Sequence, residues 1–260
     1  MVVIAVVAGA VIGLSLGALG GGGSILAVPV LVYALYLDPQ AATTASLIIV
    51  GVTAIAAAIS HARAGRVEWR AALIFGALGI PASIGGSVLN RAVDPQVLLL
   101  AFAALMLVAA AAMYRRSRAS EQPPTTPSHT GVTPVVRVVV VALVVGFLTG
   151  FLGVGGGFLI VPALVLAMGF GMPTAVGTSL VIISITSLAA FVERLGHGAI
   201  AWDVIVPFTA AATAGSLIGK RLSERVSGAT LTRAFAVLLV LVAGYVAVRA
   251  GSQLYGAWWG

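Results

Sequence analysis

The sequence has very little charge and no cysteine. Only 8% of its 260 residues are charged and 60% are apolar, whereas about 25% of an ordinary soluble domain is charged. Without cysteine, neither disulfides nor thiolate metal sites arise. No Asp, Glu, Lys or Arg falls in the middle of an apolar run, which argues against an intramembrane carboxylate relay. There is also no grouped set of metal ligands and no serine beside a base, so we expect no metal, no cofactor and no enzyme activity.

The uncharged runs are too long for a soluble fold. Asp38 is the only formal charge from Met1 to Ala62, and none occurs from Val138 to Val192. As one helix, the second run would be roughly 80 Å long, so it must cross a hydrocarbon core of about 30 Å repeatedly. The runs also lack the strict polar–apolar alternation of barrel strands. We therefore predict an all-α, polytopic membrane protein, whose surroundings are the lipid bilayer.

Apolar runs and their Gly or Pro boundaries predict two sets of about five membrane segments. They are expected at 2–19, 24–37, 41–60, 69–89 and 96–114, then at 134–152, 157–170, 174–193, 202–222 and 230–250. The stretch 115–133 between the sets is polar and proline-rich, and is predicted to be a cytoplasmic linker. The predicted domains are a first transmembrane repeat, 1–114, this linker, and a second transmembrane repeat, 134–260.

The two sets are copies of one another. They align without a gap at an offset of 133 residues, which takes Pro29 to Pro162 and Trp69 to Trp202. A chance match of apolar segments would pair scattered Leu and Val, whereas this alignment also pairs glycine, proline and tryptophan. We infer an internal duplication.

Each copy carries a glycine run in front of its short segment: LGGGGSILAVP at 19–29 and LGVGGGFLIVP at 152–162. As a helix, 24–37 rises only about 21 Å. Four extended residues of the glycine run add roughly 13 Å, which is enough to complete a crossing. A broken or short helix inside the membrane is therefore predicted in each copy. Five crossings per copy then give repeats of inverted topology.

The distribution of Lys and Arg favours this inversion. With five crossings per repeat, one side of the membrane holds Arg63, Arg66, Arg70, Arg115, Arg116, Arg118, Arg137, Lys220, Arg221, Arg225 and Arg233, and the other holds Arg91, Arg194 and Arg249. Basic residues prefer the cytoplasmic side. Re-entrant short segments would make the halves parallel and divide the charges evenly. Topology thus explains the net charge of +7, and no nucleic-acid partner is expected, because no basic domain exists to bind one.

The helix starts after the glycine runs are the predicted binding site for a small anionic substrate. The first N–H groups of a helix are unpaired and carry a partial positive charge, and glycine lets a ligand approach them. Hydroxyls at the start of the next span could donate to the same anion, or could only cap and bond neighbouring helices. The predicted substrate-binding residues are Gly21, Gly22, Gly23, Ser24, Thr43, Thr44, Ser46, Gly155, Gly156, Gly157, Thr178 and Ser179.

Other glycines and the histidines of the sequence have simpler interpretations. Glycines can merely let helices pack closely, and we interpret Gly9, Gly13, Gly17, Gly79 and Gly244 in this way. His61 ends a span beside Arg63, and His197 lies in a loop. We interpret both histidines as solvated residues at the membrane surface, in preference to proton shuttles.

The duplicated glycine–proline motif, the tetrads TASL at 44–47 and GTSL at 177–180, and the spacing of His61 and Gly65 together resemble the sulfite exporter TauE/SafE family. The resemblance covers nearly the whole chain except 115–133. It implies an integral inner-membrane permease that exports sulfite, sulfonates such as sulfoacetate, or related small anions. The second copy differs from the first, since Arg194 stands where the first has His61 and Val154 interrupts the glycines.

These observations predict a transporter, expected to be an exporter, of small sulfur-containing oxyanions that works by alternating access. One alternative is a passive anion channel through the same breaks, or a permease for another small anion. Another is a non-transporting membrane partner or receptor, which the lack of a sizeable soluble domain disfavours. Faces rich in small residues could support a homodimer, although they serve packing within one chain equally well.

Overall fold

The computed structural model describes residues 2–90, 92–119, 132–152, 157–193 and 201–259, and within these ranges the chain forms helices and no strands. Eight of the described helices are long and apolar enough to cross a membrane. They are α1 (Val2–Leu19), α3 (Pro39–Arg63), α4 (Trp69–Asn90), α5 (Pro95–Ala119), α6 (Val132–Leu152), α8 (Met172–Glu193), α9 (Trp202–Glu224) and α10 (Gly228–Trp259). The prediction of an all-α, multi-pass membrane protein is therefore confirmed.

The two remaining elements are the short helices that follow the glycine runs. The first is α2 (Gly22–Tyr33), and the second is α7 (Gly157–Pro162), which continues into the π-helical turn η1 (Ala163–Ala167). The segment expected at 157–170 is thus a short helix whose second part is π-helical. Pro162 has no N–H to donate and disturbs the α-helical hydrogen-bond ladder. In the turn after it, each backbone hydrogen bond therefore joins residues five apart instead of four.

Both short helices end on the same wide turn. In η1 the Met168 N–H donates to the Ala163 carbonyl oxygen at 3.1 Å, and at the end of α2 the Leu35 N–H donates to that of Val30 at 3.2 Å. An offset of 133 residues takes the first-half pair to the second-half pair. The duplication inferred from sequence therefore extends to the backbone hydrogen bonds.

Close helix pairs hold the bundle together, with α1 packed on α9 and α6 packed on α4. A Cβ added at Gly17 of α1 would overlap the carbonyl oxygen of Ser216, and one added at Gly150 of α6 would overlap that of Ser83. The offset of 133 residues converts the first contact into the second. Glycine thus serves close packing on α1, as predicted, but not at Gly244, where an added Cβ would meet no atom of the described residues within 4 Å.

At the centre, α3 and α8 pack against one another. A Cβ on Gly51 would lie 3.3 Å from the Cβ of Ser187, and one on Gly177 would lie 3.2 Å from the Cβ of His61. Residue numbers therefore rise along α3 as they fall along α8. These two repeat-equivalent helices are antiparallel.

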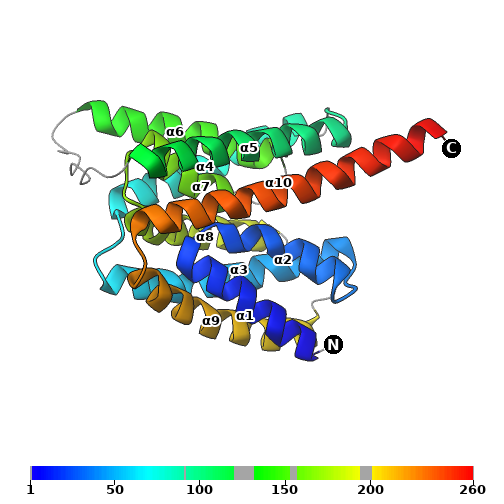
Figure 1. Cartoon of the computed structure of the whole chain (residues 1–260), viewed down its shortest axis with the longest axis horizontal. Coiled ribbons are helices and arrows are strands. Elements are labelled where there is room, and N and C mark those ends of the chain that lie inside the picture. The colour runs from blue at the N-terminus through cyan, green and yellow to red at the C-terminus, as the bar shows by residue number, and fades with distance from the viewer. Residues whose placement is uncertain (1, 91, 120–131, 153–156, 194–200, 260) are drawn as a thin grey trace.

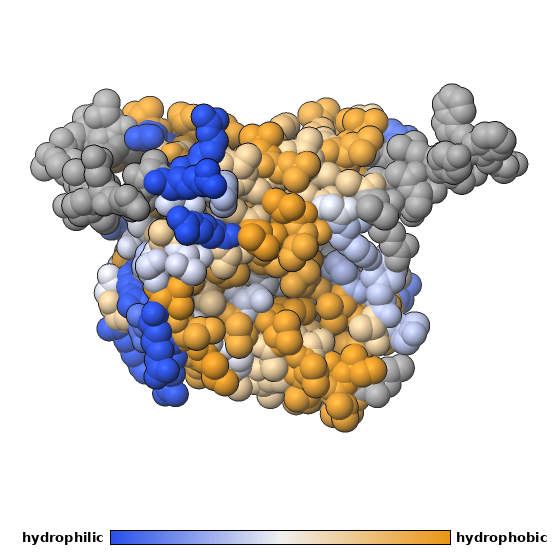
Figure 2. All heavy atoms as spheres, viewed as in Figure 1, coloured by the Kyte–Doolittle hydropathy of each residue, from blue (hydrophilic) through white to orange (hydrophobic). Residues whose placement is uncertain are grey.

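The two ends of the molecule differ in charge. Figure 1 shows the N- and C-termini at one end, on the right, and the α3–α4 and α9–α10 connections at the other, together with the end of α5 and the start of α6. The helix ends at this second end carry the basic clusters, such as Arg115 and Arg116 on α5 and Lys220 and Arg221 on α9. Figure 2 shows hydrophilic side chains gathered there and an apolar surface over the middle of the molecule.

Candidate functional site

The starts of α2 and α7 meet inside the bundle. Gly20 turns the chain with a φ of 75°, a conformation that favours glycine. The next residue, Gly21, lies so close to α7 that an added Cβ would overlap the carbonyl oxygen of Gly157. No side chain caps the start of α2, so its first N–H groups have no partner within the helix. The predicted Gly155 and Gly156 lie outside the described residues.

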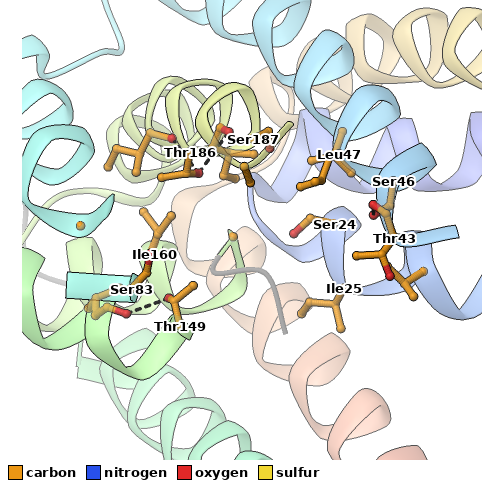
Figure 3. Close-up of a pocket in the computed structure, with 18 of the residues that line it drawn as sticks. Ser24, Ile25, Thr43, Ser46, Leu47, Ser83, Thr149, Ile160, Thr186 and Ser187 are labelled. Carbon is orange, nitrogen blue, oxygen red and sulfur yellow. Dashed lines mark hydrogen bonds between the residues drawn. The ribbon is translucent and has the colours of Figure 1, made fainter. Parts of the chain in front are cut away.

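A cavity of about 1040 Å³ lies beside these helix starts (Figure 3). Its walls come from α2, α3, α4, α5, α6, α7, α8 and α10, and they are mostly apolar, with Phe75 and Phe102 among the larger side chains. No charged side chain of the described residues lines it. The volume is at the upper end of the range of about 300–1,000 Å³ that is typical of small-molecule sites.

Hydroxyl groups are the polar side chains of this cavity. They belong to Ser24, Thr43, Ser46, Ser83, Thr149, Thr186, Ser187 and Tyr245. Most bond back to their own helix: the Ser24 hydroxyl donates to the Gly21 carbonyl at 2.7 Å, and that of Ser46 donates to the Thr43 carbonyl at 2.8 Å.

Such hydroxyls can turn toward a bound anion. Rotation gives up a neutral hydrogen bond worth about 0.5–1.5 kcal/mol and forms one to a charged group worth about 1.5–3 kcal/mol. The exchange is favourable for an anion, and the apolar surroundings strengthen it. The cavity is therefore suited to an anion that is held by neutral donors.

Comparison with known proteins assigns nearly the whole chain to one family. The family model described as "Sulfite exporter TauE/SafE" matches residues 5–246. The chain belongs to the sulfite exporter TauE/SafE family. Relatives of this TauE/SafE protein include a probable membrane transporter protein of Xylella fastidiosa (strain Temecula1), which is 35% identical over 255 residues and 97% of each chain.

More distant relatives carry similar descriptions. The probable membrane transporter protein YunE of Bacillus subtilis is 26% identical, over 92% of this chain and 95% of its own. A probable membrane transporter protein of Haemophilus influenzae is 26% identical, over 93% of this chain and 96% of its own. No solved structure matches the chain. The protein is thus a multi-pass member of a family of membrane transporters.

In this TauE/SafE protein the predicted binding residues of the first half lie at or near the cavity. Ser24, Thr43 and Ser46 line it, and so does Gly157 from the second half. Gly21, Gly22 and Gly23 are buried behind it and pack against neighbouring helices. Thr44 does not line the cavity, and its hydroxyl donates to the Gln40 carbonyl at 3.2 Å.

The predicted hydroxyls of the second half lie elsewhere. Thr178 and Ser179 are 0% exposed and do not line the cavity. The Thr178 hydroxyl accepts the backbone N–H of Glu68 at 3.0 Å, and that of Ser179 donates to the Val176 carbonyl at 2.8 Å. The repeat equivalents Ser46 and Ser179 therefore have different environments, one beside the cavity and one in closed packing.

Ser83, Thr149, Thr186 and Ser187 line the cavity and were not predicted. Their only signal in the sequence is a hydroxyl inside an apolar span. Such a hydroxyl commonly satisfies itself on its own helix, as Thr149 does by donating to the Val145 carbonyl at 2.7 Å. The packing of α4, α6 and α8 around the cavity is what distinguishes these residues.

The interpretation of His61 as a solvated surface residue is wrong. Its side chain is 1% exposed, and its Nε2 lies 3.2 Å from the carbonyl oxygen of Gly17 on α1. The α3–α4 connection covers this side of the molecule, where Arg66 pairs with Glu224 at 3.7 Å. Sequence position at a span end did not indicate burial, because the connection after α3 folds back over it.

Removal of one cavity hydroxyl should weaken substrate binding. We expect Ser46→Ala to raise the KM for transport about fivefold, which corresponds to the roughly 1 kcal/mol difference between a charged and a neutral hydrogen bond. Initial rates of uptake into proteoliposomes measure this. Thr44→Ala is the matched control, since its hydroxyl lies on the same helix and outside the cavity. Equal KM values for Ser46→Ala and the wild type would remove Ser46 from the site.

Proposed function

We propose that the protein exports a small sulfur-containing oxyanion, such as sulfite or an organosulfonate, by alternating access. The observation that carries the proposal is the hydroxyl-bearing cavity beside two helix starts. The description of the family names sulfite, and relatives are described as probable membrane transporters. In this proposal, Ser24, Thr43 and Ser46 donate to the anion beside the first N–H groups of α2.

The absence of a charged side chain from the described cavity lining suits transport as well as binding. A helix start contributes roughly half a positive charge, which attracts an anion without trapping it. A fixed lysine or arginine would add a strong ion pair in an apolar site and slow release. Neutral donors therefore fit a ligand that must leave the site on every cycle.

One-sided access supports alternating access over a passive channel. Thr186 lines the cavity, whereas its repeat equivalent Thr53 is 1% exposed and its hydroxyl has no hydrogen-bond partner among the described residues. Ser46 and Ser179 differ in the same way. In our proposal the second set forms the wall of an equivalent cavity that opens when the first one closes.

The helix contacts support repeats of inverted topology. A two-fold axis in the membrane plane would make repeat-equivalent helices antiparallel, and α3 and α8 run antiparallel. The same axis would convert the contact between Gly17 and Ser216 into that between Gly150 and Ser83, and both contacts occur. Transporters with such repeats exchange the conformations of their two halves.

We assign the basic end of the molecule to the cytoplasm, since Lys and Arg prefer that side. The 115–133 linker is then cytoplasmic. Ile84, Val192 and Tyr245 of the cavity lining lie toward the ends of α4, α8 and α10 that are remote from the basic end. The cavity accordingly faces away from the cytoplasm, in the state from which an exporter releases its substrate.

Flux into proteoliposomes tests this function. Purified protein should transport radiolabelled sulfite or an organosulfonate with saturation, and unlabelled substrate inside the vesicles should accelerate entry by counterflow. Counterflow needs a site that alternates between the two sides, so a channel does not produce it. Conductance at channel rates without saturation would favour the passive channel, and a lack of flux with every sulfur oxyanion would contradict the proposed substrate class.

A further inference from the structure

His61 occupies a buried position at the basic end of the bundle, away from the cavity. Because the Gly17 carbonyl oxygen can only accept, Nε2 at 3.2 Å must carry the hydrogen. In a neutral imidazole Nδ1 then holds a lone pair. This Nδ1 is buried and has no hydrogen-bond partner among the described residues. One ring nitrogen is thus free to accept a proton, in a place where the charged form would be poorly solvated.

The groups around His61 also disfavour a second positive charge in the closed packing. From the α3–α4 connection it faces Arg66, and from α9 it faces Lys220 and Glu224. Glu224 already pairs with both cations, at 3.7 Å from Arg66 and 3.1 Å from Lys220. The other neighbouring elements, α1 and α8, meet His61 with the backbone of Gly17 and Gly177. No uncommitted carboxylate of the described residues stands ready to balance an imidazolium.

The bond from His61 ties α3 to the end of α1 that leads into the first glycine break. Gly17 is three residues before Gly20, and an added Cβ at Gly20 would lie 2.6 Å from the Ser179 hydroxyl. Ser179 and Thr178 belong to the closed half of the proposed site. Separation of α1 from α3 and α8 here would both expose His61 and uncover these hydroxyls.

We propose that His61 is a proton-binding site that controls opening toward the cytoplasm. This proposal rests on the proposed alternating-access function. Neutral His61 stabilises the closed packing through Gly17. A proton taken from cytoplasmic water onto Nδ1 gives an imidazolium that needs an acceptor or water at that nitrogen, and the cytoplasm-open state supplies the water. Protons therefore bind the open state more tightly and shift the population toward it.

The two copies of the sequence also differ at the position of His61. The repeat equivalent of His61 is Arg194, whose guanidinium stays charged at any physiological pH. The first copy therefore has an ionisable imidazole where the second copy has a permanently charged group. Because Nδ1 reaches water from one side only, the proton returns to the cytoplasm and is not carried across. A fall in cytoplasmic pH would thus increase the population of the cytoplasm-open state, and no proton would cross the membrane with the substrate.

Transport of an organosulfonate between pH 8 and pH 6 tests the proposal, since the charge of a sulfonate does not change in this range. We expect wild-type flux in proteoliposomes to rise with acid, by up to about tenfold per pH unit, the limit for one proton. His61→Gln keeps an N–H donor for Gly17 and cannot titrate, so its flux should not vary with pH. His129→Gln, outside the described residues, is the matched control and should keep the wild-type profile. A wild-type profile in His61→Gln would overturn the proposal.

A direct titration keeps the test independent of transport and of the folding of His61→Gln. With His129 and His197 both replaced by Gln, His61 is the only histidine, and its ¹⁵N signals in the detergent-solubilised chain report each ring nitrogen. We expect a protonated Nε2 and a bare Nδ1 at pH 8, and protonation of Nδ1 on acidification. A protonated Nδ1 at pH 8 would overturn the proton site. If the expected titration occurs but no flux is found, the transport function fails and the proton site stands.

Discussion

Gly21→Ala is expected to abolish transport while the protein still inserts into the membrane. The added methyl group would overlap the carbonyl oxygen of Gly157, so the starts of α2 and α7 must move apart. Gly21 itself has an ordinary helical conformation, with φ of −56° and ψ of −15°, so alanine brings no backbone strain and the effect is purely one of space. Overpacking of this kind costs typically about 1–3 kcal/mol, which a protein can survive, but the proposed anion site beside the helix starts would lose its geometry.

The measurement is substrate flux, together with the melting temperature in detergent. Gly244→Ala is the matched control, because an added Cβ there meets nothing within 4 Å, and it should keep wild-type flux. Wild-type flux in a correctly folded Gly21→Ala protein would show that the meeting of the two breaks has no part in transport.

The positions of the helices could be predicted from sequence because long apolar runs and their Gly or Pro boundaries determine them. Long uncharged runs must form helices in a membrane, where every backbone polar group needs a partner, and each predicted span has its helix in the described residues. The break before α2 follows from four consecutive glycines that precede a segment too short to cross. The early start of the π-helical turn, directly after Pro162, was not predictable, since the α-helix continues after the equivalent Pro29 to Tyr33 and the wide turn comes only at its end.

The site was only partly predictable, because a hydroxyl or a histidine in an apolar span looks the same in sequence whichever way it faces. Ser24 was found through its place in the first glycine motif and Ser46 through its alignment with Ser179, whereas Thr149, three residues before the second motif, was not singled out. Ser46 and Ser179 align in the two copies, yet only Ser46 meets the cavity. A duplicated sequence does not indicate which copy faces the cavity, because aligned residues such as these are the same in both copies. His61 was misjudged for a related reason, since its burial depends on the fold of the α3–α4 connection.

A pair of single cysteines should distinguish the open half from the closed half. The chain has no cysteine of its own, so each substitution gives one reactive thiol. Gly79 lines the cavity, and a Cβ added there meets nothing within 4 Å. Its repeat equivalent, Ala212, is fully buried, with α1 packed against its backbone. We expect a water-soluble thiol reagent to modify Gly79→Cys about 10- to 1,000-fold faster than Ala212→Cys, because a minor conformation is typically populated at about 0.1–10%.

Bound substrate should lower the modification rate of Gly79→Cys, and a change of conformation should alter the rates of the two cysteines in opposite directions. Substrate in the cavity should protect Gly79→Cys. A shift toward the cytoplasm-open state should slow this thiol further and accelerate Ala212→Cys, because α1 leaves α9 as the second half opens. Mass spectrometry of the modified protein gives both rates. If the modification rates of both thiols increased together, the two halves would be open at the same time, as in a channel. Opposite changes in the two modification rates require that one half closes when the other opens. In our proposal, this alternation lets a binding site without a fixed charge move an anion across the membrane, because no continuous pore forms.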